Sequence, residues 1–366
     1  MKKIFYRLFA LLFNLYTILT VRKNRISLLA PHPESEHDSL RELKRYIESK
    51  GGYDIREISV PRGSVTGFIG FILNKSRILA TSEYIFLNDN FMPMADMKFK
   101  KGTVVTQLWH GEGAFKKFGL ATDIPDEIAQ RLIKCTGRLD CIVTTSQNVN
   151  SVYAEAFGAD ESKIKALGSP RCDFLIRNRN STDLRRSFDE IYPEAKGKKL
   201  ILYAPTFRDN DEADGRLLSE TDFKYLKNEL GDEYALLIKL HPRIHSSVIP
   251  EGLINVTDYD INELTVISDM LITDYSSVCM NFALLSKPCI FYAFDLDEFK
   301  NDRSFYYDYK SYVPGPVITD YRDLPGEIKN SRTSEKCTGF RNFNFDYLDD
   351  KSSQRIYEAI ISSSLQ

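Results

Sequence analysis

Several residue types and motifs are scarce in this 366-residue chain or missing from it. It has one tryptophan, five histidines and six cysteines. It lacks the P-loop and G-x-G-x-x-G patterns that cradle nucleotide phosphates, and it lacks the His-Glu-x-x-His pattern of zinc hydrolases. These absences argue against a P-loop enzyme and a dinucleotide-dependent dehydrogenase, and we expect no cofactor and no dedicated metal site.

The six cysteines form no Cys-x-x-Cys pair and have no histidine at zinc-finger spacing. Most of them stand in apolar runs, as Cys289 does between Pro288 and Ile290. Free cysteine is among the most buried residue types, and disulfides are rare in reducing compartments. We therefore expect reduced thiols in the core of a cytosolic protein.

Charge is unevenly distributed along the chain. The 49 basic and 51 acidic residues give a net charge of −2, which argues against a general nucleic-acid binder. The first 25 residues, however, contain six basic residues and no acidic one. A basic, apolar N-terminus on an acidic body suggests contact with an anionic membrane surface. The residues expected to make this contact are Lys2, Lys3, Arg7, Arg22, Lys23 and Arg25.

The charge-free segment 8–21 is short for a membrane span. As a helix it would be about 21 Å long, whereas the hydrocarbon core is about 30 Å thick. A polar stripe at helical spacing is formed by Lys3, Arg7, Asn14 and Thr17. The pattern favours a helix lying in the membrane interface over an ordinary docking helix or a span, and a basic run in place of a cleavage site argues against a signal peptide.

Two successive runs of short apolar strands with helical patterns between them, such as 37–50, make up the rest of the chain. The expected strands are 26–30, 55–60, 84–87, 103–108 and 141–145 in the first run, and 200–204, 235–240, 253–256, 270–273, 290–294 and 317–319 in the second. This alternation is typical of parallel sheets with helices on both faces. The polar segment 177–183 between the runs predicts a hinge.

The predicted fold is therefore α/β, with two doubly wound domains that face a cleft and an N-terminal amphipathic helix. Ligands in such sheets bind beyond the carboxyl ends of the strands. The expected divisions are a membrane-associating helix at 1–24, an N-terminal domain at 25–180, a C-terminal domain at 181–335, and a helical segment at 336–366 that packs back on the N-terminal domain.

Two histidines stand where strands are expected to end. His110 follows the strand 103–108 and precedes Gly111, in a turn where the backbone can approach a ligand. Since imidazole accepts a proton near neutral pH, it is a candidate general base; a histidine that only caps the turn is the alternative. His241 ends the strand 235–240 between two basic residues, which suits a phosphate, although a hydrogen-bonded strand-end histidine fits equally.

The segment 270–285 predicts a strand followed by a helix. The strand leads into Thr-Asp-Tyr-Ser-Ser, and apolar residues then repeat at helical spacing. Ser276 or Ser277 is a suitable N-cap, and a helix N-terminus suits a phosphate; serines that only cap the helix fit the sequence equally well. Arg171, Arg208 and Arg243 each follow turn-forming residues and could grip phosphate oxygens or form surface ion pairs.

Six ordered blocks between residues 107 and 317 resemble the CDP-glycerol:glycerophosphotransferase family of wall teichoic acid synthesis. The blocks are QLWHGEGAFKKFG (107–119), GSPRCDFL (168–175), LYAPTFRD (202–209), IKLHPRI (238–244), ITDYSSVCMNFALLSKPCIFYAFDLDEF (272–299) and YVPGPV (312–317). One detail departs from the expected pattern, because Glu112 stands where a small or neutral residue is usual.

The resemblance implies a GT-B-like fold of two Rossmann-type domains, the first for the acceptor and the second for the CDP-alcohol. It implies transfer of glycerol phosphate or ribitol phosphate from CDP-glycerol or CDP-ribitol to an undecaprenyl-linked acceptor, with release of CMP, at the cytoplasmic face of the membrane. It also implies catalytic roles for His110 and His241. The substrate-binding residues implied by the matched motifs are Gly111, Arg171, Thr206, Arg208, Pro242, Thr273, Asp274, Ser276 and Ser277.

On this interpretation His110 takes the proton of the acceptor hydroxyl, while His241 and Arg208 stabilise charge on the phosphates. The lack of an extra domain before residue 25 favours a primase-like enzyme, and one sequence does not decide between the two donors. Two other hypotheses remain open: a GT-B glycosyltransferase or epimerase that uses a UDP-sugar, and a non-catalytic scaffold docked on the membrane.

Overall fold

The computed structural model describes residues 2–32, 35–60, 65–208, 211–240, 249–302 and 305–362. The chain divides into two compact units. Unit 1 contains residues 1–174 and 349–366, and unit 2 contains residues 175–348. His241 and Pro242 lie outside the described residues.

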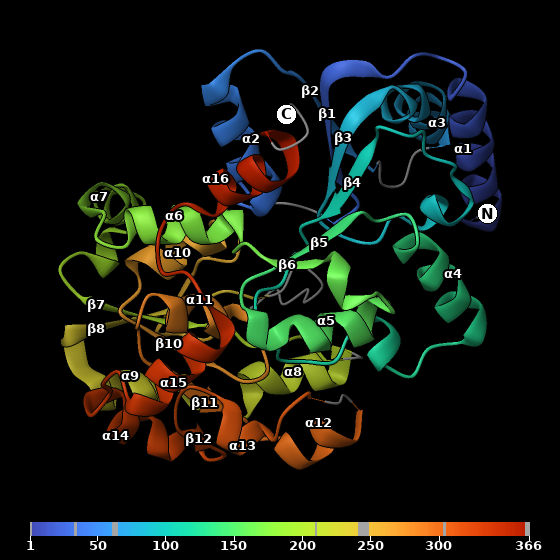
Figure 1. Ribbon diagram of the computed structural model, residues 1–366. Coiled ribbons are helices and arrows are strands. Elements are labelled where there is room, and N and C mark those ends of the chain that lie inside the picture. The colour runs from blue at the N-terminus through green and yellow to red at the C-terminus, as the bar shows by residue number, and fades with distance from the viewer. Residues whose placement is uncertain are drawn as a thin grey trace. The chain divides into compact units, whose positions relative to one another are not determined.

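Unit 1 is built on a sheet of six parallel strands in the order β2-β1-β3-β4-β5-β6 (Figure 1). The strands are β1 (Arg22–Ala30), β2 (Asp54–Ser59), β3 (Ser82–Leu87), β4 (Val104–Gln107), β5 (Cys141–Thr144) and β6 (Ile164–Ala166). The helices are α1 (Lys2–Tyr16), α2 (Ser39–Lys50), α3 (Val65–Ala80), α4 (Asp126–Thr136), α5 (Asn150–Phe157), α6 (Pro170–Asn178) and α16 (Ser352–Ile356). Strand order reverses between β1 and β3, so the residues after these two strands flank the crevice where ligands of open α/β sheets bind.

The core of unit 1 explains why residues 39–50 form a helix. Leu40, Leu43 and Ile47 recur on one face of α2 and are at most 1% exposed, packed against the β-sheet residues Ile26 and Phe86. α6 crosses the boundary between the units, and its N-terminal part belongs to unit 1.

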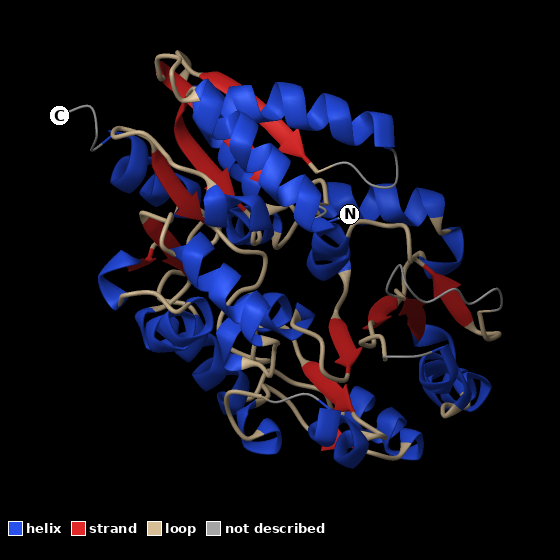
Figure 2. Ribbon diagram, turned by 90° about the vertical axis from the view of Figure 1, so that its right-hand side faces the viewer, coloured by secondary structure: helices blue, strands red, loops and turns tan. Residues whose placement is uncertain are grey.

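Unit 2 is a second parallel sheet, in the order β12-β11-β10-β7-β8-β9, and Figure 2 shows helices beside the strands of both sheets. Its strands are β7 (Lys199–Tyr203), β8 (Tyr234–Ile238), β9 (Leu253–Asn255), β10 (Met270–Thr273), β11 (Cys289–Tyr292) and β12 (Val317–Ile318). Its helices are α7 (Thr182–Ile191), α8 (Asp211–Ser219), α9 (Phe223–Leu230), α10 (Ile261–Ile267), α11 (Val278–Leu284), α12 (Leu296–Asp302), α13 (Tyr309–Tyr312), α14 (Leu324–Lys329) and α15 (Glu335–Asn344). Here the strand order reverses between β7 and β10, which brings the residues that follow these two strands together.

Three details differ from the sequence predictions. β6 was not expected, because only one residue of this short strand is buried and no apolar run marks it. The predicted hinge at 177–183 is largely helical, since α6 ends at Asn178 and the Ser181 side chain caps α7 by accepting from the Leu184 N–H. α11 is buried on every side instead of amphipathic, which is typical of a helix enclosed by other elements.

Candidate functional site

His110 follows β4 on a strained piece of backbone. Trp109 has a φ of +61°, a left-handed conformation that bulky residues rarely adopt and that costs about 1–3 kcal/mol. Its N–H donates to Oε1 of Gln107 at 3.0 Å, and its ring stacks on Phe118 with centroids 5.1 Å apart. These contacts hold the turn that presents the next residue, His110.

The His110 ring is fixed by three neighbours. Its Nδ1 lies 2.9 Å from the carbonyl oxygen of Asn88, which follows β3. The ring stacks on His32 with centroids 4.4 Å apart and planes 8° apart, and the Trp109 ring lies 4.3 Å away at 33°. Because a carbonyl only accepts hydrogen bonds, Nδ1 of His110 carries the proton, and Nε2 of the neutral ring has the lone pair of a base.

Burial lowers the pKa of His110 below its ordinary value of 6.5. The nearby His32 and Arg171 lower it further, whereas Asp89 and the bond to the Asn88 carbonyl act in the opposite direction. The imidazole is therefore neutral at neutral pH, which is the state a general base requires.

Asn88 joins the two stacked histidines. Its carbonyl accepts from His110, and its side-chain amide donates to the His32 carbonyl at 3.0 Å while its Oδ1 accepts from the His32 N–H at 3.3 Å. Sequence reasoning missed both His32 and Asn88 as site residues. Their positions directly after β1 and β3, on either side of the strand-order reversal, are the signal that could have found them.

Arg171 holds the loop after β4 from within unit 1. Its Nη2 donates to the His110 carbonyl at 2.8 Å, and its Nε lies 3.2 Å from Asp38 and 3.5 Å from Glu112. Glu112 is 6% exposed and also accepts from the Ser169 hydroxyl at 3.0 Å. Arg171 thus lies between two carboxylates, one of them the unusual Glu112, and holds the His110 loop; its contact with a phosphate stays a prediction.

Gly111, the other predicted residue of this loop, is held through its backbone. Its carbonyl accepts a hydrogen bond of 2.8 Å from the Tyr153 hydroxyl on α5. The loop after β4 is therefore anchored at successive residues.

In unit 2, Arg208 lies after β7 and is 7% exposed. Its guanidinium contacts Asp295 at 2.6 Å and Asp274 at 2.9 Å, and it also donates to the Thr206 carbonyl. Burial lowers the pKa of Arg208, but the two carboxylates raise it by more, so it stays charged. These internal acceptors take up most of the N–H groups of Arg208, and its contact with a phosphate stays a prediction.

Thr273 and Asp274 are likewise parts of the buried framework. The Thr273 hydroxyl donates to the Ala204 carbonyl at 2.6 Å, and Asp274 accepts from the Thr206 N–H at 2.8 Å. These bonds link the ends of β10 and β7. Both residues are at most 2% exposed, so they support the predicted substrate-binding loop from the interior of the protein.

Three hydroxyl groups near these residues are not tied into this buried hydrogen-bond network. The Thr206 Oγ1 is buried and has no hydrogen-bond partner within the described part of the chain. Ser277 is exposed at the start of α11 and makes no capping bond with its side chain, while the Ser276 hydroxyl is 3.4 Å from the Val278 nitrogen. These hydroxyls keep hydrogen-bonding capacity that the contacts of Arg208 largely use up, and their contact with a phosphate stays a prediction.

The N-terminal helix packs one face on unit 1 and exposes the other. Phe9 and Phe13 are buried, and Asn14 bonds the backbone of Asp96 and Lys98. The predicted polar stripe is therefore not a continuous exposed surface. The exposed face of α1 is instead apolar, and we define the apolar surface of α1 and α3 as these residues of α1, Ile18 in the turn after it and two residues of α3: Ile4, Leu8, Leu11, Leu15, Ile18, Ile69 and Leu73.

The predicted membrane-contact residues separate into two groups. Lys3, Arg7, Arg22 and Lys23 are exposed, although Lys3 pairs with Glu127 on α4. Arg25 is corrected: it is 6% exposed and binds Asp54 at 2.7 Å and the Thr81 hydroxyl at 2.9 Å. The side chain of Lys2 lies outside the described residues.

All six cysteines are free thiols and buried, as predicted. Across the described ranges, no three side chains of histidine, cysteine, aspartate or glutamate gather in a way that could hold a metal ion. No described helix combines the length and apolar character that crossing a bilayer requires.

Comparison with known proteins identifies the relatives of the chain. A family model described as CDP-glycerol:poly(glycerophosphate) glycerophosphotransferase matches residues 69–362. The teichoic acid poly(ribitol-phosphate) polymerase of Bacillus spizizenii is 36% identical, over 77% of this chain and 47% of its own length. The teichoic acid ribitol-phosphate primase of the same organism is 33% identical, over 78% of this chain and 76% of its own length.

A solved structure of the wall teichoic acid polymerase TagF has the same fold. It aligns with a TM-score of 0.82 and 24% identity, covering 100% of this chain and 97% of that chain. The predicted α/β, GT-B-like fold class is thereby confirmed.

Proposed function

Because the chain belongs to the CDP-glycerol:poly(glycerophosphate) glycerophosphotransferase family, we propose that it transfers glycerol phosphate or ribitol phosphate from a CDP-alcohol to an undecaprenyl-diphosphate-linked acceptor. The observation that carries the proposal is the His110 ring, held neutral with Nε2 as its proton-accepting atom. A base of this kind is what an attacking hydroxyl needs.

In the proposed reaction the acceptor hydroxyl gives its proton to Nε2 of His110. Its oxygen forms a bond to the phosphorus that bears the alcohol, and the bond from that phosphorus to the bridging oxygen breaks, releasing CMP. Thr206, Ser276 and Ser277 supply hydroxyls to the phosphates. The contribution of His241 and Pro242 remains a prediction, since both lie outside the described residues.

The test is CMP release from CDP-glycerol and from CDP-ribitol, each with a lipid-linked disaccharide analogue as acceptor. We expect release with one donor, and we expect His110→Ala to reduce it by about 10²–10⁴-fold while thermal protection by the donor is kept. Turnover of His110→Ala within about tenfold of the wild type would remove this residue from the base role.

The mass of the product decides between the two modes of the family. Addition of a single unit indicates primase-like activity, which we propose, and a ladder of masses indicates a polymerase. Protection by a UDP-sugar and by neither CDP-alcohol would favour the epimerase or glycosyltransferase alternative. Absence of CMP release with either donor would favour the scaffold.

We also propose that the protein works at the cytoplasmic face of the membrane as a peripheral protein. The support is the exposed apolar surface of α1 and α3, where Ile4 is 71% and Ile18 is 87% exposed. Large exposed apolar patches are uncommon on soluble proteins and mark interaction sites. Arg7, Arg22 and Lys23 add positive charge that attracts anionic lipids.

A further inference from the structure

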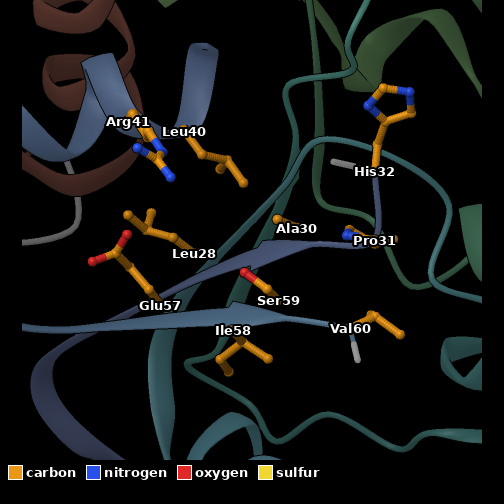
Figure 3. A pocket seen from close by; sticks show the side chains of 10 residues that line it. All are labelled: Leu28, Ala30, Pro31, His32, Leu40, Arg41, Glu57, Ile58, Ser59 and Val60. Atoms are coloured by element: carbon orange, nitrogen blue, oxygen red, sulfur yellow. The ribbon is translucent and has the colours of Figure 1, made fainter. Parts of the chain in front are cut away.

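A cavity of about 280 Å³ lies beyond the carboxyl ends of β1 and β2 in unit 1. Figure 3 shows Arg41, Leu40 and Glu57 toward one end of it and Pro31 and His32 toward the other. Its remaining lining residues are Leu28, Ala30, Ile58, Ser59 and Val60.

His32 connects the cavity to the candidate base. It lines the cavity, and its ring is stacked on His110 with centroids 4.4 Å apart. Ser59 on β2 stands opposite Ala30 in the sheet register, two residues before His32. A molecule that occupies the cavity and extends past His32 therefore arrives beside the His110 ring.

The size of the cavity restricts what it can hold. Its volume is slightly smaller than that of typical ligand pockets, which have volumes of about 300 Å³ or more. A pocket of this size suits one group of a larger substrate.

The charges around the cavity disfavour an anion. The Arg41 guanidinium is paired with Glu36, and the Glu57 carboxylate is paired with Lys44. A lining carboxylate repels a phosphate, and the nearest guanidinium already has a counter-ion. What the lining offers is hydrogen bonding from Ser59, Arg41, Glu57 and His32 beside the aliphatic side chains Leu28, Leu40 and Ile58.

We infer that this cavity is a subsite for an uncharged polyhydroxylated group of the acceptor, which it holds so that the reactive hydroxyl reaches Nε2 of His110. The inference rests on the proposed transferase function and extends it to acceptor recognition. Hydroxyls of the group bond the polar side chains, and its C–H faces pack on the leucine and isoleucine side chains. A sugar ring and a terminal polyol share this chemistry.

The test fills the cavity with Ser59→Phe. Ser59 is exposed on the edge strand β2, so the substitution adds bulk with little disturbance of the core. The matched control is Ser49→Phe, on the exposed surface of α2 and outside the cavity lining. Ser59→Leu, a smaller change, serves if Ser59→Phe fails to fold, as judged by thermal unfolding and protection by the donor.

Two readouts are measured with two acceptors, a lipid-linked disaccharide analogue and the same analogue carrying one polyol phosphate. The first is the acceptor KM for CMP release at saturating donor, which we expect to rise about 10–200-fold in Ser59→Phe with the donor KM unchanged. The second is acceptor binding followed by the fluorescence of Trp109, the single tryptophan, which lies against His110 and reports binding without turnover.

A rise for the disaccharide acceptor alone identifies a sugar subsite, and a rise for the polyol acceptor alone identifies a polyol subsite. An acceptor KM and an acceptor Kd within twofold of the control, for both acceptors, would overturn the inference. If the wild-type protein releases no CMP, the proposed function is contradicted. The fluorescence titration then still decides whether the cavity binds the acceptor.

Discussion

At the scale of single residues, the state of His110 is set by groups that do not react. Its pKa lies below 6.5 chiefly because the ring is buried, and in part because a second imidazole, His32, is stacked on it. A protonated His110 cannot act as a base. The rate should therefore depend on pH through the neighbours of His110 as well as through His110 itself.

We expect kcat/KM to fall on the acid side with an apparent pKa below 6.5. His32→Ala removes the stacked imidazole that lowers the pKa of His110 and uncovers the His110 ring, so it should move the acid-side fall in kcat/KM toward higher pH. His32→Phe keeps the burial and should move it less. If the acid-side fall in kcat/KM has the same apparent pKa in the wild type, His32→Ala and His32→Phe, then His32 does not influence the pKa of His110.

The lowered pKa of His110 also makes the free energy of unfolding depend on pH. The folded protein releases the His110 proton more readily than the unfolded chain does, so the unfolded state binds more protons below about pH 6.5. The contribution of His110 to the free energy of unfolding is therefore present above that pH and is lost as the pH falls through the lowered folded-state pKa.

Arg208 illustrates how a residue in a family motif can have a structural role. Arg208→Met leaves Asp274 and Asp295 buried without their cation, which should lower the free energy of unfolding by about 3–5 kcal/mol. Arg216→Met is the control, since its ion pairs with Glu220 and Glu298 are exposed and should cost at most about 1 kcal/mol. Chemical denaturation measures both changes.

A different result for Arg208→Met would assign this residue to ligand binding. An Arg208→Met protein as stable as the control, but no longer protected by a CDP-alcohol, would return Arg208 to the role of a phosphate ligand.

At the scale of elements, every strand except β6 was predictable from the sequence, and the buried polar contacts were not. Strands such as β7 and β10 are short apolar runs because both faces of a parallel sheet are covered, and a single sequence records that pattern directly. His110 was found because it follows such a strand. Pairings such as Arg25 with Asp54, or Arg171 with Glu112, join residues far apart in the chain, and no local pattern encodes them.

The exposed stripe of α1 can be tested as an element. Ile4, Leu8, Leu11 and Leu15 recur every three or four residues and share one face of α1. We expect Leu11→Glu to weaken cosedimentation with vesicles that contain phosphatidylglycerol, because a charge replaces apolar contact at the interface. CMP release with a water-soluble acceptor analogue should be unchanged.

Ile191→Glu is the matched control, because it makes the same kind of change at an exposed apolar residue of α7, outside α1, and it should bind vesicles like the wild type. Equal vesicle binding by Leu11→Glu and the control would exclude α1 as the membrane contact.

At the scale of the whole molecule, unit 1 is completed by the last part of the chain. Asp173 accepts from the backbone N–H groups of Ser352 and Ser353 at 2.8 Å each, and the Tyr53 and Tyr357 hydroxyls are 2.8 Å apart. Gly168 has a φ of +89°, and a Cβ there would lie 2.4 Å from the Ser352 hydroxyl oxygen. Glycine at position 168 is thus what allows α16 to pack so closely.

Asp173→Ala should detach this segment in part. Two buried N–H groups lose their acceptor, and a buried group without a partner costs about 1–3 kcal/mol, measured as a lower free energy of unfolding. Faster proteolysis near residues 345–351 should accompany it. Asp183→Ala, at an exposed carboxylate on α7, should leave both quantities unchanged, and an Asp173→Ala protein that matches it would contradict the anchoring role.

The discontinuity of unit 1 has a consequence for biosynthesis. During translation, residues 175–348 emerge from the ribosome as a continuous stretch and can fold before the chain is finished. Unit 1 is complete only when residues 349–366 have also been made, which happens after the whole of unit 2 has been synthesised. The unit that carries the candidate base is therefore finished after unit 2, and the nascent polypeptide lacks that finished unit until this segment is available.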